Sequence, residues 1–165
     1  MLVVGFDPGS AVTGFGVVRG KGNRLSHLDH GVIRTSSSDA MPLRLRQLYT
    51  KAFALIEKYQ PHTVAVERIY FKQNVSTGIF VAQARGVLLL AAAQADCPVG
   101  EFSPTEMKSA VTGYGRADKA QLQEMVRRLL NLDAVPRPDD AADALALAIC
   151  QIQIGKVQSR LENLT

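Results

Sequence analysis

The sequence predicts an α/β fold in which helices cover both faces of a mixed five-stranded sheet. Three apolar runs come first, at residues 2–7, 13–19 and 25–35, and their short links predict an antiparallel meander. Strand and helix patterns then alternate along the rest of the chain. This order is typical of one sheet whose later strands are joined by helices that pack on its faces.

The elements after the meander are marked by hydrophobic periodicity. Apolar residues recur at helical spacing over residues 45–59, and Pro61 ends this helix. Residues 63–69 alternate as a strand, and a long helix is expected over about residues 76–95. The short apolar segment at residues 97–102 completes the five strands.

The C-terminal third carries signals for the ends of three helices. The segment SPTE at residues 103–106 combines a capping box with proline at the first helical position, so a helix begins there. TGYGR at residues 112–116 breaks this helix, and Asp118 is expected to cap the next one. The last helix covers DDAADALALAICQIQI at residues 139–154.

The length and composition indicate a single domain. The chain has 165 residues, 47% of them hydrophobic, which is enough for a core, and it shows no internal repeat. We expect the domain to cover residues 1–155 and the polar residues 156–165 to form a flexible tail.

The net charge indicates the kind of partner that the protein binds, and the cysteines indicate its cellular compartment. A net charge of +4 favours an anionic partner, which leaves nucleic acid, phosphorylated ligands and a membrane surface open. Cys97 and Cys150 stand far apart, as expected of buried thiols in a reducing compartment. The most apolar stretch, residues 86–95, is half of the ~20 residues that a membrane span needs. We therefore expect a soluble cytoplasmic protein without a signal peptide.

Five acidic residues stand at the ends of, or within, segments whose hydrophobic pattern predicts buried strands or a buried helix face. Asp7 ends the first strand in DPGS, where turn chemistry is an alternative role for it. Glu67 interrupts an apolar strand, and a buried carboxylate needs a partner. Asp140 and Asp143 share one face of the last helix, although capping and the helix dipole also favour acids there. Asp139 is the residue we expect as the cap.

Four carboxylates gathered in one place would repel each other and resist ionisation unless divalent cations neutralised them. A ligand set of oxygens, without histidine or cysteine, suits Mg²⁺ or Mn²⁺. Two such ions, ~3.5–4 Å apart, can activate a water and stabilise the leaving oxygen of a phosphodiester. The acids therefore predict a metal-dependent phosphodiesterase.

Four blocks of the sequence resemble the RuvC family of Holliday junction resolvases, the crossover junction endodeoxyribonucleases. They are GFDPGSAVTGFGVV, AVERIYFKQN, QARGV and DDAADALALAI, which appear in family order through nearly the whole chain. The resemblance implies a ribonuclease H-like fold and a homodimer. It implies a Mg²⁺-dependent endonuclease that makes paired symmetric nicks across a four-way DNA junction, in recombination and repair. It also implies the RuvA–RuvB branch-migration complex as a partner.

The resemblance assigns roles to the acids. It implies that Asp7, Glu67, Asp140 and Asp143 are the catalytic residues and the metal ligands, two Mg²⁺ per subunit with Mn²⁺ as a substitute. Asp140 keeps the Asp-Ala-Ala-Asp-Ala register of the family block. Asp139 is then an extra acid, either a cap or a spare ligand.

An aromatic residue follows the strand acid by three positions in the family, in a loop thought to engage unpaired bases. Here that position is Tyr70, with Phe71 and Lys72 next to it. Either aromatic ring could stack on a base, since stacking tolerates any sequence. The alternative is that Tyr70 only covers the sheet edge.

Basic residues flank the TGYGR segment. Lys108 and Lys119 match positions that the family places beside the scissile phosphate, and Arg116 lies between them. The alternative for any single surface lysine is solvation. Arg68 and Arg85 are weaker candidates for the same DNA surface.

The helix expected at residues 76–95 presents small residues, which would let a second helix approach closely. They are Gly78, Ala82, Ala84 and Gly86. The family places its dimer interface in this region, and the alternative is that the helix only packs on the sheet.

Two other functions stay open at this point. DPGSAVTGFG on a first hairpin is also the pattern of the phosphate loop in sugar kinases and actin-like ATPases, although those need two such domains. The second alternative is a ribonuclease H-like relative that cuts RNA or linear DNA, or that only binds.

Overall fold

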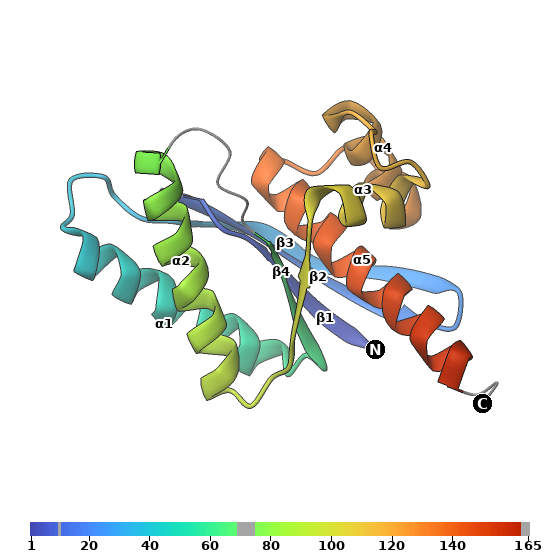
Figure 1. The fold of residues 1–165 in the computed structure, drawn as a ribbon, viewed down its shortest axis with the longest axis horizontal. Coiled ribbons are helices and arrows are strands. Elements are labelled where there is room, and N and C mark those ends of the chain that lie inside the picture. The colour runs from blue at the N-terminus through green and yellow to red at the C-terminus, as the bar shows by residue number, and fades with distance from the viewer. Residues whose placement is uncertain (10, 69–74, 163–165) are drawn as a thin grey trace.

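A five-stranded sheet in the order β3-β2-β1-β4-β5 forms the middle layer of the protein (Figure 1). The computed structural model describes residues 1–9, 11–68 and 75–162. The strands are β1 (Leu2–Asp7), β2 (Val12–Lys21), β3 (Arg24–Arg34), β4 (Thr63–Glu67) and β5 (Val99–Phe102). The first three pair as an antiparallel meander, whereas β4 runs parallel to β1 and to β5. The predicted mixed sheet is confirmed.

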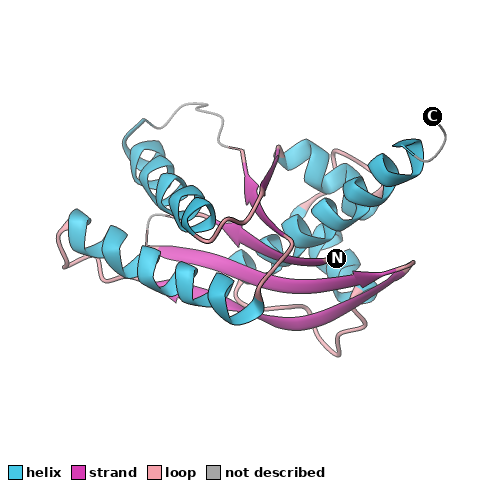
Figure 2. Cartoon of the chain, turned by 90° about the horizontal axis from the view of Figure 1, so that it is seen from below, coloured by secondary structure: helices cyan, strands magenta, loops and turns pink. Residues whose placement is uncertain are grey.

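Helices cover both faces of this sheet, as predicted (Figure 2). On one face lie α1 (Met41–Tyr59) and α2 (Val75–Gln94), which also contact each other. On the other face lies α5 (Asp139–Glu162), with α3 (Pro104–Thr112) and α4 (Lys119–Leu129) packed against it. None of the helices in the described part of the chain is both long and apolar enough to cross a membrane.

The side chains of β1 contribute to two hydrophobic cores, because successive side chains of a strand point to opposite faces of the sheet. Val4 and Phe6 of β1 belong to the core under α1 and α2, and Val3 belongs to the core under α5. All three side chains are fully buried. A strand covered on both faces needs a continuous apolar run, and this explains the absence of polar alternation in residues 2–6.

Helix α5 approaches β1 and β2 closely because glycines face alanines across the contact. A Cβ atom added at Gly5 would lie 2.0 Å from the carbonyl oxygen of Ala144, and one at Gly14 would lie 1.9 Å from that of Asp140. Ala141 and Ala144 are themselves fully buried. Any larger side chain on these strand positions would therefore push the start of α5 away from the sheet.

Local capping chemistry determines where α3 and α4 begin. The Ser103 hydroxyl accepts from the Glu106 backbone N–H at 3.1 Å, and the Glu106 carboxylate accepts from the Ser103 N–H at 2.7 Å. Asp118 caps α4 in the same reciprocal way with Gln121. Both predicted caps are confirmed.

Two helices extend further than periodicity indicated. α1 begins at Met41, with Pro42 in its first turn, where proline costs no hydrogen bond. α5 continues to Glu162, since no proline follows Ile154 to stop its propagation. Residues 156–162 are thus helical, and the boundary of the domain at residue 155 stays a prediction.

Candidate active site

Two strand ends bring the first pair of predicted acids together. Asp7 is the last residue of β1 and Glu67 is the last residue of β4. The two strands are parallel neighbours, with Phe6 opposite Val66. Since carboxyl ends of parallel neighbours meet at one edge of a sheet, the two carboxylates share that edge, the usual place for a site in such sheets.

The close approach of α5 adds the second pair of acids. Gly14 stands opposite Asp7 in the β1–β2 ladder, and the backbone of Asp140 lies directly on Gly14. Asp143 follows one turn later on the same helix. The glycine therefore determines how near the start of α5 comes to Asp7.

The acids open into a cleft with a volume of about 180 Å³ between the sheet edge and helices α3, α4 and α5. Three of the predicted carboxylates line it, those of Asp7, Glu67 and Asp143, together with Lys108 and Lys119. The rest of the wall is mainly apolar and comprises Pro104, Met107, Leu122 and Leu147. Asp140 lies just outside this lining and acts on Asp7 through its charge.

The electrostatics of the cleft disfavour the ionised form of its acids. Burial raises the pKa of Asp7 to about 8, and the charges of Asp143, Glu67 and Asp140 act in the same direction. Burial also raises the pKa values of Glu67 and Asp143, with Lys108 opposing the rise at Glu67 and Lys119 opposing it at Asp143. The protein thus concentrates more negative charge here than its own lysines neutralise.

The ammonium group of Lys119 stands between two carboxylates of α5. Its Nζ lies 3.6 Å from Oδ2 of Asp143 and 3.2 Å from Oδ2 of Asp139. The other oxygen of Asp139 accepts from Gln123 Nε2 at 3.0 Å and from the Arg137 guanidinium. Hydrogen bonds from Lys119 and Gln123 lower the pKa of Asp139.

The prediction that Asp139 caps α5 is wrong. The helix begins at Asp139 itself, so the cap position falls on Pro138, and the side chain of Asp139 turns toward α4 instead. The cap residue precedes the first helical residue and accepts from the unpaired N–H groups that follow it. Asp139 is the first helical residue, so its own N–H is one of those groups.

The donors of the cleft fit a divalent cation. All candidate ligands are carboxylate oxygens in a half-buried setting, which is the donor chemistry of Mg²⁺ and Mn²⁺. The raised pKa of Asp7 marks a charge imbalance that such a cation would relieve. Within the described residues, no three acidic, histidine or cysteine side chains are already arranged as a ligand set, and the ammonium of Lys119 contacts the carboxylate of Asp143.

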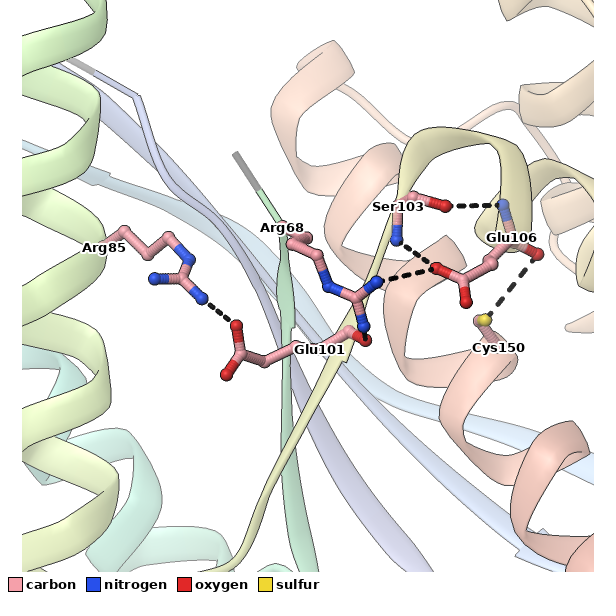
Figure 3. A network of polar contacts seen from close by, with 6 residues as sticks. All are labelled: Arg68, Arg85, Glu101, Ser103, Glu106 and Cys150. Atoms are coloured by element: carbon pink, nitrogen blue, oxygen red, sulfur yellow. Dashed lines mark hydrogen bonds and ion pairs between the residues drawn. The ribbon is translucent and has the colours of Figure 1, made fainter. Parts of the chain in front are cut away.

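A polar network links the end of β4 to the neighbouring elements (Figure 3). Arg85 of α2 donates from Nε to the backbone oxygen of Glu67 at 3.1 Å and pairs with the Glu101 carboxylate. Arg68 donates from Nη2 to the Glu101 backbone oxygen at 2.9 Å and lies 3.7 Å from Glu106. Arg85 and Arg68 therefore hold the strand that carries Glu67, a role that sequence reasoning missed.

The structure describes only some of the other residues predicted to contact DNA. Tyr70, Phe71 and Lys72 lie outside the described residues. Arg116 is exposed on the loop between α3 and α4, outside the lining of the cleft. Of the basic residues predicted around TGYGR, Lys108 and Lys119 are thus the two that the fold brings to the acids.

Comparisons with known proteins agree with this geometry. Residues 3–151 match the family described as "Crossover junction endodeoxyribonuclease RuvC". A protein of that name from Desulfitobacterium hafniense is 52% identical over 161 residues, which cover 98% of each chain. One from Thermosipho melanesiensis is 49% identical over 150 residues, which cover 91% of this chain and 96% of the relative.

Solved structures give the same result. A Thermus thermophilus RuvC structure matches with a TM-score of 0.89 and 34% identity, covering 96% of this chain and 97% of that one. The same protein in complex with Holliday junction substrate matches with a TM-score of 0.92 and 33% identity, covering 96% of each chain. The chain belongs to the RuvC family of crossover junction endodeoxyribonucleases, whose ribonuclease H-like fold it shares.

Proposed function

We propose that the protein is a structure-selective endonuclease that resolves four-way (Holliday) DNA junctions by paired symmetric nicks, in homologous recombination and DNA repair. The observation that carries this proposal is the cleft in which Asp7, Glu67 and Asp143 face Lys108 and Lys119. Family membership and the likeness to RuvC in complex with Holliday junction substrate support the choice of substrate.

The four carboxylates would hold the metal. Asp7, Glu67, Asp140 and Asp143 are the proposed ligands of two Mg²⁺ ions per subunit, for which Mn²⁺ can substitute. A divalent cation supplies a Lewis acid that polarises the phosphodiester and lowers the pKa of an attacking water. Asp7 is central to this set, because the charges of all three other acids act on it.

The lysines and the apolar wall of the cleft favour binding of a phosphate group. Lys108 and Lys119 present ammonium groups on the cleft lining, where they can donate to the phosphate oxygens of a bound strand. The apolar part of the cleft wall lowers the local dielectric constant around the acids, which strengthens these charge interactions. Hydrolysis by water requires no nucleophile from the chain. Tyr70, Phe71, Lys72 and Arg116 are proposed to contact the junction beyond the cleft, on the family resemblance.

A homodimer would place two such clefts on one junction. Helix α2 exposes large apolar side chains at Ile79, Phe80 and Leu90, and open space surrounds Gly86. An exposed apolar face on a helix that lies on the outside of the sheet favours a second protein surface. A two-fold dimer supplies the symmetry that paired nicks need. The RuvA–RuvB complex as partner and a cytoplasmic location stay predictions.

The decisive experiment compares substrates. Purified protein is incubated with a synthetic four-way junction, a linear duplex of the same sequence and an RNA·DNA hybrid, each with Mg²⁺ or with chelator. We expect symmetric nicks in the junction alone, which disappear with chelator and with Asp7→Asn, while Asp7→Asn still binds the junction. Nicks in all three substrates would point to a general nuclease, and ATP turnover without nicking to the kinase-like alternative.

A further inference from the structure

Two residues of α4 reach the same carboxylate at the start of α5. Lys119 and Gln123 are four residues apart, so they lie one above the other on one face of α4. Both contact Asp139, Lys119 through Oδ2 at 3.2 Å and Gln123 through Oδ1 at 3.0 Å. Gln123 is only 7% exposed, which holds its amide, and with it Asp139, in one orientation.

The same lysine also contacts a residue of the cleft. Asp139 and Asp143 are four residues apart on α5, and the Lys119 ammonium bridges them at 3.2 and 3.6 Å. Asp143 lines the cleft, whereas Asp139 does not. Lys119 therefore has one carboxylate partner inside the site and one outside it.

We propose that Asp139 is a positioning residue that keeps Lys119 at the rim of the cleft and so leaves the Asp143 carboxylate available to a divalent cation. This inference rests on the proposed function, in which Asp143 is a metal ligand. An ammonium group and a metal ion compete for the same carboxylate oxygens. A second carboxylate outside the cleft retains the lysine near the phosphate while the cation takes Asp143.

The contacts of Asp139 favour the role of positioning Lys119 over the role of a spare metal ligand. One of its oxygens accepts from Gln123 and Arg137, and the other faces Lys119. Both oxygens are therefore already paired with donors from the protein. Without the charge of Asp139, Asp143 would be the nearest carboxylate left to Lys119.

The test measures Mn²⁺ binding by calorimetry without DNA, on the folded full-length protein. In Asp139→Asn the side chain still accepts from Gln123 but no longer attracts Lys119. We expect its Mn²⁺ affinity to fall about twofold to fivefold, the range of one exposed ion pair. Asp139→Ala should behave alike, and thermal unfolding verifies that each variant is folded. Arg137→Ala removes a partner of Asp139 but not the lysine, and should leave the affinity unchanged.

A double-mutant cycle with Lys119→Ala separates positioning from a direct effect. If Asp139 acts through Lys119, the Asp139→Asn change has no effect on Mn²⁺ affinity once Lys119 is alanine. An equal loss in both backgrounds, or no loss in either, would overturn the proposal, and so would wild-type protein that binds no Mn²⁺. Failure of the wild type to cut junctions refutes the proposed substrate instead, because the calorimetry contains no DNA.

Discussion

Replacing Asp7 by asparagine should stabilise the metal-free protein at neutral and alkaline pH, although it should abolish cleavage. Burial and three neighbouring carboxylates raise the pKa of Asp7 from 3.8 to about 8. The folded state therefore retains a proton between about pH 4 and pH 8 that the unfolded chain releases. With an acid of raised pKa, the free energy of unfolding falls as the pH rises through this window.

The structure provides an upper bound for the effect. Each pH unit between the unfolded and folded pKa values corresponds to about 1.4 kcal/mol, so the full window corresponds to about 6 kcal/mol. The Lys119 ammonium opposes the rise, and solvent in the cleft relaxes around the charge. We therefore expect Asp7→Asn to gain about 2–4 kcal/mol over the wild type at pH 8, and less than about 1 kcal/mol at pH 5.

Urea unfolding with chelator at pH 5 and pH 8 measures this difference. The exposed Asp133, replaced by asparagine, is the matched control for loss of one negative charge without burial. Adding Mg²⁺ at pH 8 should stabilise the wild type and leave Asp7→Asn nearly unchanged. Equal stabilities of the wild type and Asp7→Asn at pH 8 would show that the acids do not form the repulsive cluster described here.

Three further variants test two supports of the site and the proposed dimer interface. Arg85→Ala should lower the rate of junction cleavage about tenfold and the stability by about 1–2 kcal/mol, because the partly buried Glu67 carbonyl loses its donor; unchanged cleavage in a folded variant would contradict the role of this network. Gly14→Ala should cost more than about 3 kcal/mol in urea unfolding, since its Cβ would collide with the backbone of α5, and an unchanged stability would contradict this close contact. Leu90→Glu should give a monomer in analytical ultracentrifugation, and Leu28→Glu, at an exposed leucine outside α2, should remain dimeric; a dimeric Leu90→Glu would place the interface elsewhere.

Sequence patterns predicted the fold, and the acids at the ends of two of its strands, because those features are local. Asp7 and Glu67 each end an apolar run, and an acid at the end of a buried strand lies at the edge of the sheet whatever the rest of the fold. The capping signals at Ser103 and Asp118 likewise depend on residues within four positions, and both are borne out. The interpretation of Asp139 as a cap fails because two of its partners, Lys119 and Gln123, come from another helix.

The sequence by itself determined the chemistry of this protein, a set of carboxylates and lysines on a mixed sheet, since residue type and spacing are written in the chain. The tertiary structure alone decided how those groups interact. The glycine at position 14 lets α5 descend onto β2, and this contact sets the crowding that raises the pKa of Asp7. The placing of Lys119 between Asp139 and Asp143 depends on two helices meeting. Such distances arise from packing between segments far apart in sequence, which no local pattern encodes.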